Sequence, residues 1–260
     1  MFCVAKNRQS VKGSGVAHIA KPLKHWFRRH TSAGRRLLTE QSPAWVRRWF
    51  GPLGNYADLL LVDHGVFRLI YLNQHRLGSK AWRSAQPSPL DIAGFKRRGV
   101  KTVVNLRGER KCGAYWLERA ACQRHGITLE NCVLRSRAAP SVSELLAVRD
   151  LLLRIEYPIL IHCKSGADRA GLMSVLYMHL VEGQSIEEAV LQLSWKFGHF
   201  KQADTGVLDH FFAAYLVENA GGPIDFYEWV ETRYDPRNVL ATFRANGLAS
   251  RIVNDILRRE

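Results

Sequence analysis

A cysteine and an arginine separated by five residues are the side chains with the clearest chemistry in this 260-residue sequence. Residues 161–171 read Ile-His-Cys-Lys-Ser-Gly-Ala-Asp-Arg-Ala-Gly, which places Cys163 ahead of Arg169. An ionised thiol is a strong nucleophile, and a planar guanidinium can hold two oxygens of one phosphate group. Gly166, between them, permits a tight backbone curve. These residue types at this spacing predict a loop that binds a tetrahedral anion and attacks it with sulfur.

A strand before this motif and a helix after it would position the loop. Pro158–Ile161 is a short apolar run that predicts a buried strand, and residues 170–182 carry apolar side chains at helical spacing. A loop that joins a strand to a helix can turn its backbone N–H groups inward, and the helix N-terminus adds partial positive charge. We therefore expect a phosphate-binding cradle formed by Lys164, Ser165, Gly166 and Ala167.

The remaining pattern alternates strands and helices, which predicts an α/β fold with a central, mostly parallel sheet flanked by helices. The expected strands are Val66–Leu72, Lys101–Leu106, Ile127–Leu134 and Pro158–Ile161. Ser88-Pro89 and Pro140-Ser141 are typical of helix starts, and Tyr115–His125 has the pattern of a further helix. After the motif we expect mostly helix, at residues 170–182, 186–197 and 206–219.

His162, Cys163, Gly166 and Arg169 match the signature HCxxGxxR, so the chain resembles the cysteine-dependent protein tyrosine and dual-specificity phosphatases. The resemblance covers about residues 64–215. Trp82–Pro87 and Val104–Gly108 look like segments of the atypical bacterial and plant/fungal dual-specificity type. The resemblance implies a phosphatase-like fold and two steps: Cys163 attacks phosphorus to form a phosphocysteine, and water then releases phosphate. It also implies that Arg169 and the loop amides stabilise the phosphoryl oxygens, with no metal or cofactor.

The sequence lacks the loop acid that this family usually supplies to protonate the leaving group, since residues 135–140 contain no carboxylate. Asp168 lies inside the motif, at a position that resembles that of an acid in the myotubularin lipid phosphatases, for which a proton-donor role has been proposed. The alternative is that Asp168 orients Arg169 or a neighbouring amide, and both roles stay open. Glu130 falls inside an expected strand, so we expect a surface strand residue there.

A second difference follows the arginine, where most family members carry Ser or Thr and this chain has Ala170. That hydroxyl helps the thiolate to leave when phosphocysteine breaks, so its absence predicts a slow second step. The two differences keep an alternative open, in which the chain binds phosphate without turnover. A rhodanese-type sulfurtransferase also places a cysteine in a loop after a strand, but five residues between Cys163 and Arg169 suit phosphate better.

Four arginines lie near predicted strand ends or on the loop that should border the pocket: Arg83, Arg107, Arg135 and Arg137. Because ligands of α/β folds bind outside the carboxyl ends of strands, this group favours a substrate with several negative charges. Each arginine alone has the alternative of a solvated surface charge. Arg107, at the end of an apolar strand, is the one we expect to bind substrate. For His199, beside aromatic residues, we expect a hydrogen-bonded packing role.

These features predict hydrolysis of phosphomonoesters of the phosphotyrosine or dual-specificity type. The expected partner is a phosphorylated protein or a polyanionic phosphate. Hydrolysis of an inositol phosphate or a phosphoinositide is the alternative.

Positive charge is concentrated at the start of the chain. Residues 1–50 hold 11 Lys or Arg and one acid, within a formal net charge of +15 for the whole chain. We expect a basic, partly flexible arm over residues 1–55 and one catalytic domain with a helical C-terminal part over residues 56–260. The arm is either a solvated tail or a contact to an anionic membrane surface, and no module for specific nucleic-acid binding follows it.

Five cysteines without a CxxC pair argue against a disulfide scaffold or a zinc ribbon and are typical of a reducing compartment. No run approaches 18 uncharged apolar residues, and the start MFCVAKNRQS lacks the apolar segment of a secretory signal. We therefore predict a cytoplasmic protein with no metal site.

Overall fold

The computed structural model describes residues 72–245. The expected arm, residues 1–55, and nearly all of the expected strand Val66–Leu72 lie outside this range. Five short strands in the described part form one sheet in the order β1-β2-β5-β3-β4. They are β1 (His75–Leu77), β2 (Ala81–Ser84), β3 (Thr102–Asn105), β4 (Thr128–Asn131) and β5 (Ile159–His162). Because β1 alone pairs antiparallel with its neighbour in this sheet, the predicted mostly parallel sheet is confirmed.

The parallel strands β2, β5 and β3 end level with one another. Ser84 pairs with His162, and His162 pairs with Asn105, in the registers of these strands. The residues that follow each strand therefore meet at one edge of the sheet. Cys163 is the first residue after β5, and residues 85–86 and 106–107 reach the same edge from β2 and β3. In parallel sheets this carboxyl edge is where ligands bind.

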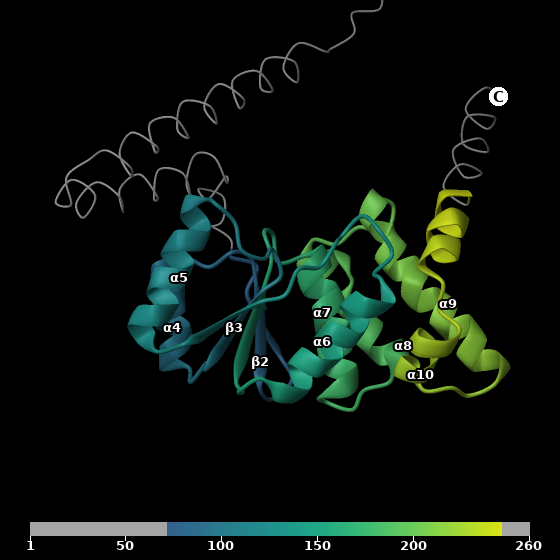
Figure 1. Cartoon of the computed structure of the whole chain (residues 1–260), viewed down its shortest axis with the longest axis horizontal. Helices are drawn as coiled ribbons and strands as arrows, with labels where there is room; N and C mark the ends of the chain where they lie inside the picture. The colour runs from purple at the N-terminus through teal and green to yellow at the C-terminus, as the bar shows by residue number, and fades with distance from the viewer. Residues whose placement is uncertain (1–71, 246–260) are drawn as a thin grey trace, which may run out of the picture. The chain divides into compact units, whose positions relative to one another are not determined.

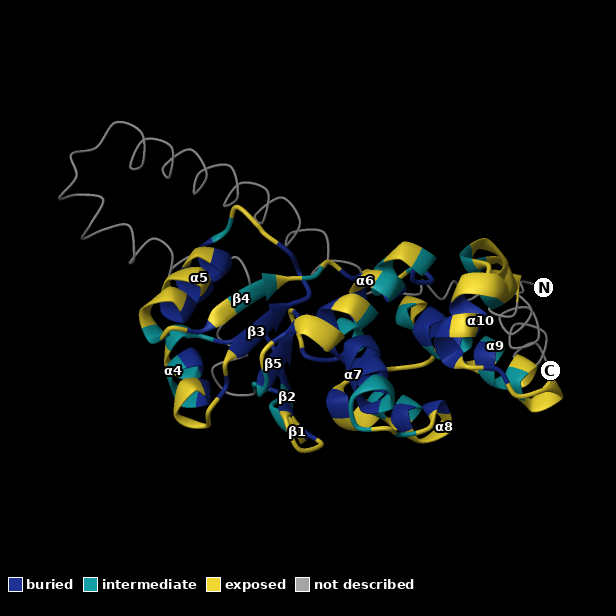
Figure 2. Cartoon of the chain, turned by 60° about the horizontal axis from the view of Figure 1, so that its bottom comes forward, coloured by how far each residue is buried: buried dark blue, intermediate teal, exposed yellow. Residues whose placement is uncertain are grey.

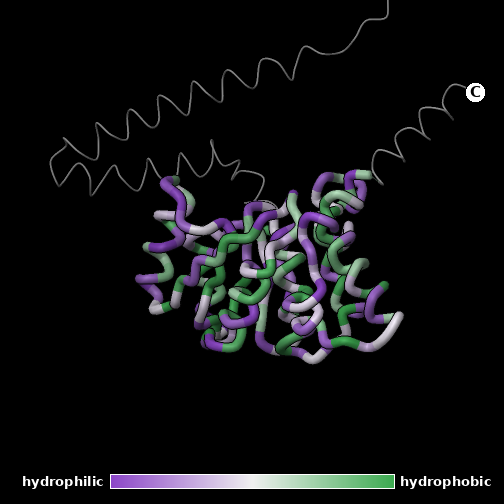
Figure 3. Tube along the Cα trace, turned by 45° about the vertical axis from the view of Figure 1, so that its right-hand side comes forward, coloured by the Kyte–Doolittle hydropathy of each residue, from purple (hydrophilic) through white to green (hydrophobic). Residues whose placement is uncertain are grey.

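Helices cover both faces of the sheet. The helices α4 (Pro89–Arg97) and α5 (Gly113–His125) lie on one face, and α6 (Val142–Arg154) and α7 (Asp168–Leu180) lie on the other (Figure 1). Successive strand residues point to opposite faces. Val103 and Leu160 accordingly pack with α4 and α5, whereas Val104 and Ile161 pack with α6 and α7. The central strands β2, β5 and β3 are buried between these two layers, whereas the edge strand β4 has no buried residue (Figure 2). Hydrophobic segments gather in the same central region (Figure 3).

The serines that predict helix starts cap α4 and α6 in the same way. The backbone N–H of Asp91 donates to Ser88 Oγ (3.3 Å), and the backbone N–H of Ser88 donates to the Asp91 carboxylate (2.8 Å). Ser141 and Glu144 repeat this exchange at 3.2 and 2.7 Å. A capping box of this kind satisfies N–H groups of the first turn that have no partner within the helix. The predicted starts of both helices are confirmed.

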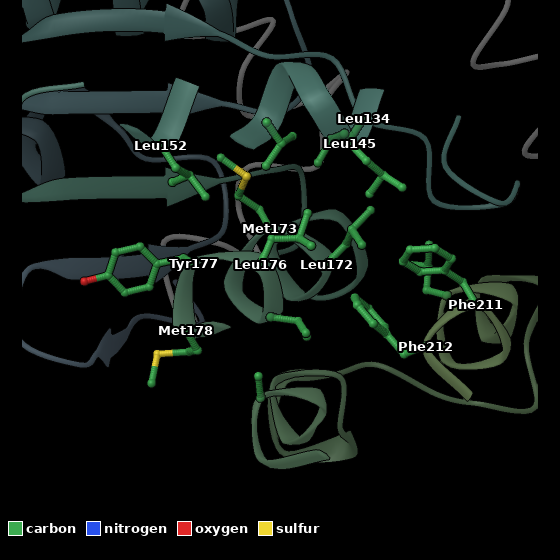
Figure 4. Packing of buried hydrophobic residues seen from close by; sticks show 14 of the residues in the cluster. Leu134, Leu145, Leu152, Leu172, Met173, Leu176, Tyr177, Met178, Phe211 and Phe212 are labelled. Carbon is green, nitrogen blue, oxygen red and sulfur yellow. The ribbon is translucent and has the colours of Figure 1, made fainter. Parts of the chain in front are cut away.

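The helix α7 is enclosed by other elements, and every residue from 170 to 178 is buried. In Figure 4, Leu172 lies on the side of Phe211 and Phe212 of α9 (Val207–Gly221), and Met173 lies on the side of α6. A helix that is apolar on all sides is stable only between other layers. This packing holds the first turn of α7, which carries Asp168 and Arg169, in a defined position.

The segment after α7 is helical but interrupted. The predicted helix 186–197 is wrong, because the chain forms α8 (Ile186–Ala189) and two 3-10 turns, η2 (Val190–Gln192) and η3 (Trp195–Phe197). Leu193, between the turns, is buried against Gly171 of α7, where a side chain would collide with it. A third turn, η4 (Asp204–Gly206), leads into α9, and α10 (Phe226–Thr232) and helical residues 236–245 complete the described part.

Candidate active site

The loop that joins β5 to α7, residues 163–169, is called the Cys163 loop below. Cys163 is buried, with 2% of its surface exposed. Lys164 and Ser165 are exposed, and Gly166 and Ala167 are buried. Ala167 is the N-cap residue of α7 and has no side chain that could accept a hydrogen bond from the first turn. Uncapped N–H groups and the positive end of the helix dipole favour an anion at this point.

The carbonyl groups of the Cys163 loop point outward. Four successive carbonyls accept hydrogen bonds from groups outside the loop: Lys164 from the amide of Gln86 (3.4 Å), Ser165 from the side chain of Asn73 (2.9 Å), and Gly166 and Ala167 from Arg83 (2.8 and 3.0 Å). In a trans peptide the N–H points opposite to the C=O. The N–H groups of residues 165–168 are therefore directed to the inner side of the loop. That of Ala167 makes a long bond to Ser165 Oγ, 3.4 Å, which an anion can replace.

Arg83 of β2 contacts the outer side of the Cys163 loop, and its side chain is fully buried. Nη2 donates to the two loop carbonyls, while Nη1 donates to the backbone oxygen of Gln192 at 2.7 Å. The guanidinium lies 4.1 Å from the ring centre of Phe197. Burial lowers the pKa of Arg83 to about 10, against the opposing influence of Cys163 and Asp168, so the side chain is charged at neutral pH. The alternatives of a solvated charge or a substrate contact are both wrong for Arg83, because loop and core atoms surround it.

Gly166 is the residue at which the loop turns back over β2. Its φ is +74°, a left-handed conformation that side-chain-bearing residues rarely adopt. A Cβ at this position would lie 2.7 Å from the backbone nitrogen of Ala85 and 2.7 Å from the carbonyl carbon of Ser84. Glycine is therefore required both by the backbone angle and by the close approach to β2.

Arg169 reaches back to the carboxyl edge of the sheet. Its Nη1 donates to the carbonyl of Leu106, which follows β3, at 3.4 Å. The N–H of Leu106 in turn donates to the carbonyl of His162 at 3.0 Å. Since His162 directly precedes Cys163, these bonds bring the guanidinium to the edge where the cysteine lies. Arg169 is half-buried, which leaves part of its fork accessible.

A series of buried polar side chains, each in contact with the next, leads from Arg107 to His162, the residue before Cys163. Arg107 Nη1 donates to Gln86 Oε1 (2.7 Å), and Gln86 Nε2 donates to Glu118 Oε2 (3.0 Å). Glu118 Oε1 lies 2.5 Å from His162 Nε2, and both side chains are fully buried. A buried carboxylate needs such partners. This series of contacts places Arg107 at the carboxyl edge with 8% of its surface exposed, and its role as a substrate contact stays a prediction.

The other charged residues considered from the sequence lie in surface contacts. Arg135 forms two bonds to Glu144, at 3.0 and 2.8 Å, beside the cap of α6, and Arg137 is exposed. Glu130 pairs with Arg154 at 3.2 Å on β4. The solvated alternative therefore holds for Arg135 and Arg137, and the surface-strand interpretation holds for Glu130.

Asp168 accepts a hydrogen bond from a buried histidine. His199 Nδ1 lies 2.8 Å from Asp168 Oδ1, and His199 Nε2 lies 2.6 Å from Asp209 Oδ2 on α9. Burial alone would lower the pKa of His199, but the hydrogen bonds to both carboxylates raise it to about 9. His199 is therefore protonated at neutral pH and donates to both carboxylates. The packing role that the sequence predicts for His199 describes only part of its contacts, because His199 also bonds Asp168 of the Cys163 loop.

Three supporting residues have no signal of their own in the sequence: Asn73, Glu118 and Asp209. Each contacts the site from a distant position in the chain, so local pattern and spacing do not reveal it. Arg83 and Gln86, by contrast, lie in the Trp82–Pro87 segment that the family resemblance already marks. Within residues 72–245, no three His, Cys, Asp or Glu side chains are grouped so that they could hold a metal ion. In the same part of the chain, no helix has both the length and the hydropathy needed to cross a membrane.

Comparison with known proteins relates this site to one family. The model of a family described as "DSP-PTPase phosphatase fused to NAD+ Kinase" matches residues 71–207. The dual specificity protein phosphatase TpbA of Pseudomonas aeruginosa is 28% identical over 123 residues, which are 47% of this chain and 53% of that relative. The chain thus spans about half the length of the curated relatives it matches.

Solved structures of similar fold include P. aeruginosa TpbA, with 25% identity, a TM-score of 0.44, and coverage of 55% of this chain and 90% of that one. A complex of TpbA with pTyr is also similar, with 24% identity, a TM-score of 0.44 and the same coverage. PTPMT1 is 18% identical with a TM-score of 0.43, covering 57% of this chain and 99% of that one.

Arg83→Leu removes the guanidinium that the carbonyls of Gly166, Ala167 and Gln192 share. We expect a loss of about 3 kcal/mol in the free energy of unfolding, because buried carbonyls are left without donors, and weaker binding of inorganic phosphate. Urea denaturation and calorimetric titration with phosphate measure the two effects. Arg135→Leu, which removes an exposed arginine, is the matched control and should cost less than about 1 kcal/mol. Wild-type stability and phosphate affinity in Arg83→Leu would contradict this account of the loop.

Proposed function

Because this chain belongs to the family described as DSP-PTPase phosphatase fused to NAD+ kinase, we propose that it hydrolyses phosphomonoesters through a phosphocysteine formed on Cys163. The curated relative TpbA carries the name dual specificity protein phosphatase. The residues of this chain that the family model matches, 71–207, include the whole Cys163 loop, Arg83 and Arg107.

One observation supports this proposal most strongly. Hydrogen bonds from Asn73, Arg83 and Gln86 hold four carbonyls of the Cys163 loop on its outer side. The opposed N–H groups are thereby directed to the inner side of the loop, and an anion that enters displaces only the long bond from Ala167 N–H to Ser165 Oγ. One such donor, aimed at developing charge, contributes about 10²- to 10³-fold to a reaction rate. The same donors and the start of α7 stabilise a thiolate at residue 163.

The reaction proceeds in two displacements at phosphorus. In the first, the Cys163 sulfur forms a bond to phosphorus, the bond to the leaving oxygen breaks, and that oxygen takes up a proton. In the second, a water oxygen attacks phosphorus, the sulfur–phosphorus bond breaks, and the water proton passes to a base. Arg169 and the loop amides bind the phosphoryl oxygens in both steps. Lys164, Ser165, Gly166 and Ala167 provide the cradle.

Asp168 is the carboxylate of the Cys163 loop, and we assign proton transfer to it. Its side chain is 25% exposed, beside Arg169 at the first turn of α7. One of its oxygens is occupied by His199, which leaves Oδ2 for exchange with the leaving group or with water. Orientation of Arg169 by Asp168 is the alternative role, and it would not depend on the leaving group.

The proposed substrate is a phosphorylated protein or another polyanionic phosphate. A TpbA structure is described as a complex with pTyr, and the exposed Lys164 and the edge residue Arg107 would add positive charge around a phosphate. The same positive charges would also suit inositol phosphates or phosphoinositides, which are the alternative substrates. Turnover rates measured on a panel of phosphopeptides, inositol phosphates and phosphoinositides distinguish the two substrate classes.

We also propose a reducing location such as the cytoplasm. The described cysteines, Cys112, Cys122, Cys132 and Cys163, are all free thiols, and a thiol nucleophile acts only when reduced. A contact of the basic arm with an anionic membrane surface concerns residues outside the described range and stays a prediction.

Cys163→Ser should abolish turnover of a small aryl phosphate while inorganic phosphate still binds. Removal of a nucleophile lowers the rate by more than about 10⁴-fold, and the loop amides remain in place. Cys132→Ser, which changes a half-buried thiol outside the loop, should retain wild-type activity. If wild type itself fails to turn over any phosphate that it binds, the chain is a phosphate-binding protein and the proposed function is wrong.

Ala170→Ser should accelerate the second displacement. Ala170 has no hydroxyl to donate a hydrogen bond to the departing thiolate, so phosphocysteine should accumulate in wild type and give a burst of the first product. A hydrogen bond to a charged group is worth about 1.5 kcal/mol or more, so the steady-state rate should rise about tenfold. Stopped-flow absorbance with an aryl phosphate measures both phases. The absence of a burst in wild type would show that phosphocysteine hydrolysis does not limit the rate.

A further inference from the structure

His199 lies at the centre of a chain of three charged side chains from three segments. Asp168 belongs to the first turn of α7, Asp209 belongs to α9, and His199 follows η3. The imidazole is fully buried, whereas the carboxylates of Asp168 and Asp209 are 25% and 19% exposed. Both ring nitrogens face a carboxylate oxygen, so the ring donates to both when it is doubly protonated.

The other charged groups near Asp168, His199 and Asp209 are cations, and they lie farther from the His199 ring than the two carboxylates do. Lys201 Nζ lies 3.7 Å from Asp209 Oδ1 and is largely exposed. Arg83 of β2 interacts electrostatically with Asp168 and packs on Phe197, over which Lys196 also lies at 5.5 Å. The carboxylates are therefore the groups in direct contact with His199, and they keep it protonated. Its pKa of about 9 lies well above the ordinary value of 6.5.

The loop that carries His199 is otherwise mostly exposed. Trp195 and Phe200 are 81% and 59% exposed, and Lys196, Gly198 and residues 201–204 are exposed as well. Phe197 and His199 are the buried side chains between residues 195 and 204. An apolar residue at position 199 would anchor this loop without the desolvation cost of a buried cation. Anchoring alone therefore does not account for a charged side chain aimed at Asp168.

We propose that His199 is a positioning residue, which holds the carboxylate of Asp168 in one orientation beside Arg169 and ties the loop of residues 194–204 to the Cys163 loop. The inference rests on the proposed phosphatase function. His199 occupies Asp168 Oδ1, so Oδ2 alone exchanges a proton with the leaving group or the attacking water. Asp209 orients the ring from the opposite side, as a carboxylate orients an imidazole in catalytic triads. The Asp168 carboxylate is thereby preorganised rather than free to rotate.

His199→Gln should lower kcat by about 10²-fold, the lower end of the contribution of a positioned proton-transfer group, and should leave inorganic phosphate affinity close to that of wild type. The loss in kcat/KM, which reports the first displacement, should be larger for alkyl phosphates than for aryl phosphates, because alkoxides need the proton more. Asp168→Asn should show the same dependence on the leaving group. The double variant should be no slower than Asp168→Asn, since residues that act through one group are not additive.

The pH dependence provides a second test that does not require a His199 variant to fold. A histidine whose folded pKa is raised stabilises the folded arrangement fully below the unfolded value of 6.5, and this contribution is lost as pH rises through about 9. The wild-type kcat should therefore fall above about pH 9. Asp209→Asn removes one of the two carboxylates and should move this fall to lower pH by about 1 unit.

His210→Gln is the matched control, because His210 follows Asp209 on α9 and its Nε2 lies 2.8 Å from Thr242 Oγ1, away from His199 and the Cys163 loop. It should keep wild-type kcat and pH profile. Additive losses in the double variant, or an unmoved pH profile in Asp209→Asn, would overturn the role of His199. If the wild-type protein shows no turnover that depends on Cys163, the proposed function itself is overturned. The two failures are therefore distinguishable.

Discussion

The arrangement of the candidate site depends on one buried guanidinium that holds backbone carbonyls away from the cysteine. Arg83 donates from a single nitrogen to the carbonyls of Gly166 and Ala167. Without a donor behind them, these carbonyls would be free to turn inward and repel an anion. Arginine suits this task because its planar fork bonds several acceptors and its charge persists even when burial lowers the pKa. The positive charge also lies close to the place where a phosphate would bind.

The remaining supports act on the two ends of the same loop. The buried pair Glu118 and His162 fixes the strand side, next to Cys163. On the helix side, α7 is enclosed by α6 and α9, and His199 bonds Asp168. A loop restrained at both ends and along its carbonyls loses little conformational entropy when an anion binds. Binding energy can then be used for the charge that develops in the reaction.

The sequence predicts the strand–loop–helix motif and the order of elements because these depend on local patterns. Ser88 and Ser141 mark helix starts through side chains that cap their own helix, and short apolar runs mark the buried strands. The environment of Arg83 depends instead on contacts across the fold, since its partners lie more than 80 residues away in the chain. The break at Leu193 is equally non-local, because it follows from packing on Gly171 of another helix. Local pattern cannot indicate either.

The most direct test of the central claim is a crystal structure of the full chain with orthovanadate. This anion can become five-coordinate and then resembles phosphorus in the transition state of phosphoryl transfer. The account predicts vanadium bonded to the Cys163 sulfur, with its oxygens accepting hydrogen bonds from the amides of the Cys163 loop and from Arg169. The carbonyls of Gly166 and Ala167 should remain on Arg83. Vanadate bound away from Cys163, or a loop whose carbonyls face the anion, would contradict it.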